Sequence, residues 1–267
     1  KQRKSEHING FKLMHEVKEN YFDYLSFENE SLVDFNFRDI DTKVDFAGKT
    51  LAFPVVINAI TGGCDEAYRI NKDLSELAKK YHLGFAVGSQ SIGIKNGETE
   101  SFQVARTVNP SGLLIGNLSA NRSLQDVQQA IKMIDADAIQ MHLNAPQELA
   151  MAEGDRDFKG SFNNLIKIKN SIDVPLIIKE VGFGISKETA KKITRGEFKY
   201  IDISGKGGTD FIAIEDLRNT NQDFSTLYGW GIPTPHSILN VRSINKEIFL
   251  IASGGIRSGL DIGKCIA

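Results

Sequence analysis

The chain has 267 residues, of which 41% are hydrophobic and 25% charged, an ordinary composition for a globular protein with ample length for one large core. Its formal net charge of −2 argues against nucleic acid as a partner, because nucleic-acid-binding domains are normally strongly basic. No apolar run approaches the roughly 18 residues that a membrane helix needs and no secretion signal is visible, so we expect a cytoplasmic protein with no membrane partner.

The first fifty residues precede the first strand-like segment and look irregular. They include the stretch ENYFDYLSFENESLVDFNF, which is rich in aromatic and acidic residues. Fifty residues are too few for a separate domain with a sizeable core. We therefore predict an N-terminal extension over 1–50 that packs on a single domain over 51–267 or on its neighbour.

Seven short segments share one character, a burst of β-branched and apolar residues that ends in Gly, Ser or Asn. Near-continuous apolar runs of this kind are typical of strands buried on both faces, as in a parallel sheet. The segments are FPVVINAITGG (53–63), LGFAVGSQ (83–90), GLLIGNLSA (112–120), DAIQMHLN (137–144), VPLIIKEVGFG (174–184), KYIDISGKGG (199–208) and IFLIASGG (248–255).

The segments between these predicted strands have helical spacing. Residues 67–82 repeat apolar side chains on one predicted face, namely Ile70, Leu74, Leu77 and Tyr81. A second helix is predicted to begin after an N-cap at Ser123, and a third to run from an N-cap at Ser186 to a C-cap at Gly196. Strand and helix thus alternate along the chain, which is the pattern of βα units.

Two architectures combine parallel strands with helices. A doubly wound sheet would carry GxGxxG after its first strand, and TGGCDEAYR (61–69) does not match that pattern. Polar and glycine residues instead follow almost every strand, as in an α/β TIM (β/α)8 barrel, whose active site gathers the βα loops. We predict this barrel. The sequence ends inside the helix after strand seven, so strand eight and its helix are absent from it, and we expect them to exist beyond the printed residues.

Two glycine-rich loops follow the last two predicted strands. ASGGIRSGLD (252–261) has a Gly-Gly pair that lets backbone N–H groups approach a phosphate closely, next to a predicted helix N-terminus. DISGKGGTDF (202–211) repeats the device with hydroxyls at both ends, at Ser204 and Thr209. In TIM barrels the phosphate site commonly lies beside strands seven and eight, so the pair indicates a phosphorylated cofactor.

A lysine lies inside the fifth predicted strand, at Lys179 in PLIIKEVGFG. Its charge is costly to bury unless an anion or an electron-rich ring accepts it. A structural ion pair with Glu180 is the alternative, but adjacent residues of a strand point to opposite faces. We therefore interpret Lys179 as a functional residue.

The fourth predicted strand, in IQMHLNAPQE (139–148), ends in polar side chains. His142, Asn144, Gln147 and Glu148 place an imidazole, two amides and a carboxylate within a few positions. This density indicates a binding site at the strand end. The alternative for His142 is a hydrogen-bonded core histidine that faces away from the barrel lumen.

These motifs together resemble one family. RKSEH, INAITGG, GSQS, HLNAPQE, IIKEVGFG, DISGKGGT, YGWGIPT and ASGGIR occur in the order seen in type 2 isopentenyl diphosphate isomerase, an FMN-dependent TIM barrel of isoprenoid biosynthesis. The resemblance covers essentially the whole chain. The combination of HLNAPQE with KEVGFG is its most specific part, whereas motifs such as SGG occur in many FMN barrels.

The resemblance assigns roles residue by residue. It implies FMN contacts at Ala59, Ile60, Thr61, Ser89, Asn117, Lys179, Ser204, Thr209, Gly255, Ile256 and Arg257. It implies substrate contacts at Arg3, Lys4, Ser89, Gln90, Ser91, His142, Asn144 and Gln147, with Gln147 and His142 as the catalytic candidates and Glu148 as the Mg²⁺ ligand. The chain departs from the family at Ser91, where many members carry a basic residue.

The implied reaction converts isopentenyl diphosphate to dimethylallyl diphosphate without net redox change. Reduced FMN is expected to carry the acid–base chemistry, Mg²⁺ to bind the diphosphate, and NADPH to reduce the flavin without being consumed in each turnover. The family resemblance also implies a homo-oligomer, a homotetramer or homo-octamer.

Two alternatives stay open at this point. An FMN-dependent 2-hydroxy-acid oxidase or dehydrogenase would need a general-base histidine after the sixth strand, near an arginine after the seventh. The segment 202–211 has no histidine, and His236 lies some distance further along the chain. The other alternative is a flavin- or phosphate-binding barrel without catalytic activity.

Overall fold

The computed structural model describes residues 6, 8, 10, 19–218 and 222–267, so Arg3 and Lys4 lie outside the described residues. Seven parallel strands form one sheet in chain order, and each strand falls within a segment that the sequence predicts. They are β3 (Val56–Ile57), β4 (Gly84–Ala86), β5 (Leu114–Ser119), β6 (Ala138–Leu143), β7 (Leu176–Glu180), β8 (Tyr200–Asp202) and β9 (Phe249–Ile251).

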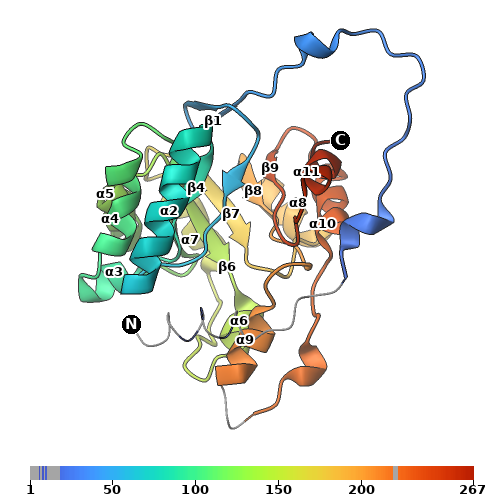
Figure 1. The fold of residues 1–267 in the computed structure, drawn as a ribbon. Coiled ribbons are helices and arrows are strands. Elements are labelled where there is room, and N and C mark those ends of the chain that lie inside the picture. Colours follow the sequence, from blue (N-terminus) through green and yellow to red (C-terminus); the bar gives the residue numbers. More distant parts are fainter. Residues whose placement is uncertain (1–5, 7, 9, 11–18, 219–221) are drawn as a thin grey trace.

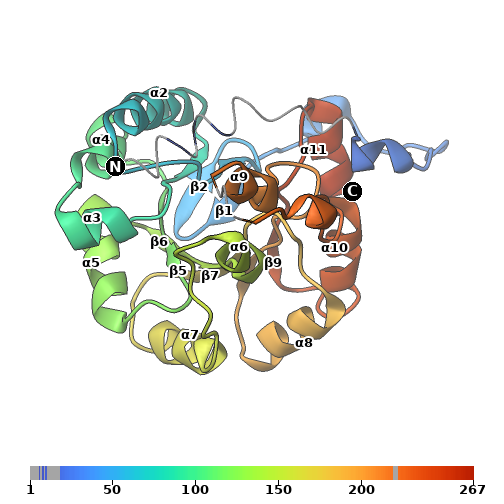
Figure 2. The ribbon, with the colours of Figure 1, turned by 90° about the horizontal axis from the view of Figure 1, so that it is seen from below.

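The sheet curls, and helices cover its outer face (Figures 1 and 2). The outer helices are α2 (Asp65–Tyr81), α3 (Ser91–Asn96), α4 (Glu100–Val108), α5 (Leu124–Ile134), α7 (Ser161–Lys169), α8 (Lys187–Arg195), α10 (Thr234–Arg242) and α11 (Gly259–Ile266). Among the described residues β3 and β9 do not pair with each other, so the sheet is an open barrel of seven βα units. The barrel prediction is confirmed in this form.

The remaining elements lie at the two ends of the barrel or outside it. Short helices α6 (Ala145–Ala150) and α9 (Phe211–Arg218) lie below the carboxyl ends of the strands in Figure 1. Three 3-10 helices are η1 (Tyr21–Tyr24), η2 (Phe37–Asp39) and η3 (Ser225–Leu227). None of the helices in the described part of the chain is long and apolar enough to cross a membrane.

The predicted helix ends are confirmed. Ser123 accepts a hydrogen bond from the backbone N–H of Asp126, whose carboxylate accepts the N–H of Ser123 in return, which forms a capping box. Ser186 caps α8 through the N–H of Thr189, and α8 ends at Gly196. A cap of this kind contributes about 1 kcal/mol of stability, enough to fix where each helix starts.

The predicted buried face of α2 is wrong in its C-terminal half. Leu77 and Tyr81 are 42% and 45% exposed, whereas α2 buries the small and polar side chains of Ala67, Asn71, Ser75 and Ala78. The Asn71 side chain donates to the backbone oxygens of Thr61 and Ser101, and so ties α2 to α4. The face of α2 that is buried is therefore set by close packing of small residues and by the hydrogen bonds of this amide, and not by the spacing of the apolar residues alone.

Alternate residues of the strands face the helices or the barrel lumen. On β6, Ile139 and Met141 pack outward in the main core, whereas Gln140 and His142 take the other face. The lumen has an apolar layer at the amino ends of the strands, which includes Ile115, Ala138 and Ile177. Polar side chains follow at the carboxyl ends, so the site lies there.

A hairpin closes the amino end of the barrel. Strands β1 (Val44–Phe46) and β2 (Lys49–Leu51) pair antiparallel and bury Phe46 and Leu51 in the apolar lumen layer. The Phe46 ring stacks on Phe249, with centroids 4.7 Å apart. Residues 1–50 are predicted to be irregular, and this hairpin departs from that prediction.

Candidate active site

A cavity of about 1350 Å³ opens at the carboxyl ends of the strands. It is lined by loops that follow all seven strands, as expected for a barrel active site. Of the residues predicted for the site, it brings together Ala59, Ile60, Thr61, Ser89, Ser91, Asn117, His142, Asn144, Gln147, Glu148, Lys179, Ser204, Thr209 and Gly255.

Three predicted contacts do not line this cavity. Gln90 is fully buried, and its amide binds the backbone N–H of Asn117 and the carbonyl of Ala130, so its placement as a substrate contact is wrong. Ile256 and Arg257 are also absent from the lining. The Arg257 guanidinium donates to the carbonyls of Gly255 and Gly207 and braces these loops from outside the cavity.

Lys179 lines the cavity and forms a buried ion pair with Asp202. Their Nζ and Oδ2 atoms are 3.0 Å apart, and the side chains are 6% and 0% exposed. The pair arises from strand register, because Lys179 of β7 lies directly beside Asp202 of β8. The predicted alternative, an ion pair with Glu180, is wrong.

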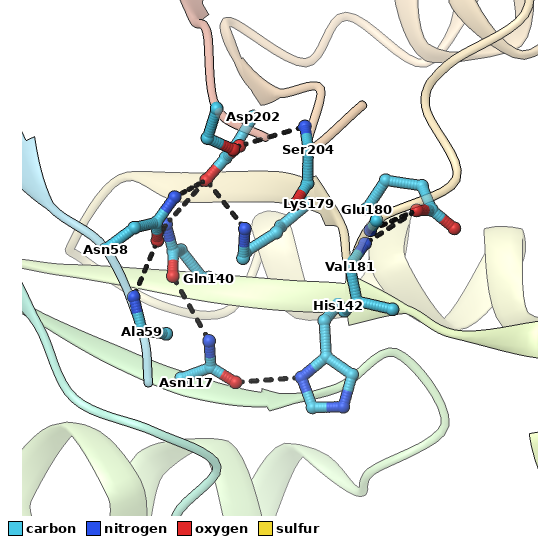
Figure 3. A network of polar contacts seen from close by, with 12 residues as sticks. Asn58, Ala59, Asn117, Gln140, His142, Lys179, Glu180, Val181, Asp202 and Ser204 are labelled. Atoms are coloured by element: carbon cyan, nitrogen blue, oxygen red, sulfur yellow. Dashed lines mark hydrogen bonds and ion pairs between the residues drawn. The ribbon is translucent and has the colours of Figure 1, made fainter. Parts of the chain in front are cut away.

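Asp202 is the centre of a buried network (Figure 3). Besides Lys179, its Oδ2 accepts the side-chain amides of Asn58 at 2.6 Å and Gln140 at 3.1 Å. Its Oδ1 accepts the Ser253 hydroxyl at 2.5 Å and the backbone N–H of Ser204 at 3.2 Å. Five donors therefore compensate the burial of this carboxylate.

The network continues from Asp202 to His142 through two amides. Gln140 Oε1 accepts Asn117 Nδ2 at 3.1 Å, and Asn117 Oδ1 lies 2.8 Å from His142 Nδ1. His142 thus lines the cavity, with its ring directed at Asn117 (Figure 3), and the alternative of a histidine that faces away from the lumen is wrong. Sequence reasoning missed both Gln140 and Asp202, although each is a polar residue in an apolar strand.

Glu180, next to Lys179, has a different task. Its Oε2 accepts the backbone N–H groups of Val181, Gly182 and Phe183 at 2.6–2.9 Å, and so shapes the loop after β7. Burial raises the pKa of Glu180 to about 7, against the opposite effect of these three donors. The carboxylate is structural, because its bonds hold the turn whose Val181 and Gly182 line the cavity.

Gln147 is held by a carboxylate that sequence reasoning missed. Its Nε2 donates to Glu215 Oε1 of α9 at 3.0 Å. Glu215 is 1% exposed and also binds Arg218, whose guanidinium reaches Glu153 and Glu6 at 3.1 Å. This chain of contacts orients the Gln147 amide at the cavity wall.

Glu148 lines the cavity, and each of its two carboxylate oxygens accepts a hydrogen bond. Oε1 accepts Asn144 Nδ2 at 2.9 Å, and Oε2 accepts the backbone N–H of Asp155 at 2.8 Å. Within the described ranges there is no cluster of three or more His, Cys, Asp or Glu that could hold a metal alone. Mg²⁺ typically binds one or two carboxylates together with substrate phosphates, and this donor set fits that mode.

The two glycine loops form a cradle against each other. A Cβ on Gly254 would lie 2.0 Å from the carbonyl oxygen of Gly205, and one on Gly255 would lie 2.6 Å from that of Gly207. In the described part of the chain, the N–H groups of Gly207, Gly208, Gly254 and Gly255 donate to no protein acceptor. Free N–H groups on closely packed glycine loops suit a phosphate.

We expect Gly255→Ala to weaken retention of a phosphorylated ligand at least tenfold. Gly255 has a φ of +75°, where a non-glycine residue costs about 1–2 kcal/mol, and the new Cβ would push the loop away from Gly207. Gly259→Ala is the matched control, because its Cβ meets nothing within 4 Å. Titration with FMN, the cofactor that the family resemblance implies, measures the effect by fluorescence, and equal affinities for both variants would contradict a phosphate site at these glycine loops.

Two cations that line the cavity have no partner among the residues that the structure describes. Lys95 of α3 and Arg122, after β5, line the cavity, and neither side chain makes a hydrogen bond or ion pair with another described residue. Lys95 lies one helical turn after Ser91, which is uncharged. Sequence reasoning missed both cations, because single charged residues in a short helix or a loop give no periodic signal.

A curled parallel sheet with a polar cavity at its carboxyl ends defines the class of βα-barrel enzymes. Two solved structures of mandelate oxidase share this fold, with TM-scores of 0.58 and 0.61 at 14% and 16% identity. Each alignment covers 88% of this chain and 68% of the oxidase. No family model matches the chain.

Curated relatives define the particular family. The isopentenyl-diphosphate delta-isomerase of Moorella thermoacetica is 43% identical over 90% of this chain and 69% of its own length. The isopentenyl-diphosphate delta-isomerase of Staphylococcus aureus strain N315 is 39% identical over the whole chain and 76% of its own length. The chain belongs to the isopentenyl-diphosphate delta-isomerase family, and its barrel agrees with the flavin-dependent type 2 branch that its motifs resemble.

Proposed function

We propose that this enzyme converts isopentenyl diphosphate to dimethylallyl diphosphate, with reduced FMN and Mg²⁺ as cofactors and NADPH as the flavin reductant. One observation carries the proposal. A single cavity is lined by the glycine cradle, by Lys179 and by the polar end of β6 (His142 to Glu148). This arrangement offers one end for a phosphorylated cofactor and another for a magnesium diphosphate.

The proposed FMN site uses the cradle for the phosphate and the loop after β3 (Ala59 to Thr61) for the ring. Lys179 places a buried cation at the cavity wall, where it would face the electron-rich pyrimidine end of the flavin. Amide and hydroxyl groups in the lining of the same cavity come from Asn117, Ser89, Ser204 and Thr209. Reduced FMN would supply the acid–base chemistry at the alkene, and the protein groups orient the two reactants.

The proposed diphosphate site lies at the end of β6. Glu148 would hold Mg²⁺, with Asn144 and His142 as further contacts to the anion. Gln147 would position the alkene, because Glu215 fixes its Nε2 and so sets the orientation of the whole amide. Arg3 and Lys4 stay proposed diphosphate contacts from the family resemblance alone.

Lys95 and Arg122 are predicted to add charge to the diphosphate site. Both are unpaired among the described residues, and charge-assisted contacts to an anion are about twice as strong as neutral ones. We expect the double variant Lys95→Ala/Arg122→Ala to raise KM about tenfold or more and to leave the flavin spectrum unchanged. Lys132→Ala and Arg69→Ala, on outward faces of α5 and α2, are the controls. A parental KM in the double variant would place both cations outside the site.

The hydroxy-acid oxidase alternative has weaker support. Its general-base histidine would have to line the cavity from the segment after β8, near an arginine after β9. His236 is exposed on α10 and does not line the cavity, and the Arg257 guanidinium binds backbone carbonyls outside it. The similarity to mandelate oxidase at 14–16% identity concerns the fold alone.

The predicted homotetramer or homo-octamer fits one surface feature. The segment between Tyr24 and Ile40 runs away from the barrel in Figure 1 and leaves apolar side chains exposed, with Leu32 at 86% and Phe37 at 83%. A second copy of the chain would cover such side chains. A cytoplasmic location and the division at residue 50 stay predictions.

The proposal is tested with purified protein, isopentenyl diphosphate, FMN, Mg²⁺ and NADPH. We expect dimethylallyl diphosphate to appear in the NMR spectrum, and no oxidation of 2-hydroxy acids by the same preparation. Bound FMN without conversion would favour the non-catalytic barrel. Oxidation of a 2-hydroxy acid without isomerisation would favour the oxidase.

A further inference from the structure

The buried network fixes the direction of every hydrogen bond between Asp202 and His142. A carboxylate paired with a lysine only accepts hydrogen bonds, so Gln140 must point its NH₂ group at Asp202. Gln140 Oε1 then accepts from Asn117 Nδ2, which leaves Asn117 Oδ1 as an acceptor. His142 Nδ1 lies 2.8 Å from that oxygen and must therefore carry a proton.

We call the chain of hydrogen bonds from Asp202 through Gln140 and Asn117 to His142 the relay. Its first three residues are buried. Gln140 and Asp202 are 0% exposed and Asn117 is 3% exposed. Asn117 and Gln140 lie side by side on β5 and β6, as His142 and Lys179 do on β6 and β7. An amide turned the wrong way round would leave a buried donor facing a donor, which is costly at such depth.

We propose that Asp202 is the positioning residue for both halves of the site. It holds Lys179 directly, and through Gln140 and Asn117 it fixes the ring and the Nδ1 proton of His142. Any exchange of a proton or hydrogen bond between His142 and a ligand then uses Nε2. The roles of Lys179 toward flavin and of His142 toward diphosphate rest on the proposed function, whereas the tautomer of His142 does not.

The test uses ¹⁵N NMR of the histidine ring in the purified protein. In the wild-type protein we expect the His142 ring to show a protonated Nδ1. Gln140→Met keeps the side-chain length and removes the amide contacts to Asp202, Asn58 and Asn117, so Asn117 can rotate and an Nε2–H form should appear. We expect activity to fall about 10–100-fold, the usual cost of losing an outer-shell partner, with FMN retention unchanged. Asp202→Asn should change both the ¹⁵N spectrum of the His142 ring and the retention of FMN.

Asn71→Leu is the control, because it removes a buried amide that has no contact with the relay. It should leave the His142 spectrum as in the wild type. Two results would overturn the proposal: a wild-type His142 that is protonated on Nε2 only, or a folded Gln140→Met variant with an unaltered ring spectrum. The wild-type measurement decides even if Gln140→Met does not fold. Absence of isomerase activity in the wild type would reject the proposed function and leave the tautomer result standing.

Discussion

Lys179→Met is expected to abolish stable FMN retention. Methionine keeps the length of the side chain but removes the cation at the cavity wall and leaves Asp202 buried without its counter-charge. Removing one partner of a buried ion pair costs about 3–5 kcal/mol, which for a bound flavin corresponds to a loss of affinity of roughly two to four orders of magnitude if the cost falls on binding.

Gel filtration followed by absorbance at flavin wavelengths measures this retention. Lys191→Met is the matched control, because Lys191 pairs with Glu188 on the exposed face of α8. Thermal unfolding of both variants without FMN shows how much of the cost falls on the fold. Parental FMN affinity in Lys179→Met would remove Lys179 from the flavin site.

Glu148→Gln is expected to reduce activity strongly and to raise the Mg²⁺ requirement at least tenfold. Glutamine keeps the size of the side chain but replaces an anionic oxygen, which Mg²⁺ prefers, with a neutral amide. One carboxylate oxygen now faces Asn144 Nδ2 and the other the backbone N–H of Asp155, so an NH₂ group would also oppose a donor.

The flavin spectrum of Glu148→Gln should stay unchanged, because the cradle and Lys179 are untouched. Glu76→Gln, an exposed change on α2, controls for the loss of one negative charge. Initial rates over a series of Mg²⁺ concentrations give the result. If the Mg²⁺ dependence of Glu148→Gln equals that of the control, the carboxylate has a structural role instead.

Much of the fold could be predicted from the sequence, because its signals are local. The apolar runs gave seven strands in the observed order, and Ser123, Ser186 and Gly196 cap helices as expected. The hairpin that carries Phe46 was missed. Strands of three residues are too short to show an alternation of apolar and polar residues. The apolar residues of the hairpin are buried only through contact with the end of the barrel.

The site could be predicted where a residue lines the cavity, and less well where it acts through a neighbour. The strand-end motif of His142 and Glu148 was visible in the sequence, and both side chains line the cavity. Asp202 was missed because its partner, Lys179, is set by the register between β7 and β8, which no local pattern encodes. Gln90 was misplaced because residues of the same motif, GSQS, point in different directions. Gln90 is buried, whereas Ser89 and Ser91 line the cavity.

The most direct measurement compares the isomerisation rate of one FMN-loaded preparation with the flavin oxidised and then reduced. We expect negligible conversion of isopentenyl diphosphate with oxidised flavin and rapid conversion after reduction by dithionite or NADPH. Over many turnovers, far less than one NADPH should be consumed for each dimethylallyl diphosphate formed, because the reaction relocates a double bond without net redox change. Equal rates in both flavin states, or one NADPH consumed for each product, would contradict the account.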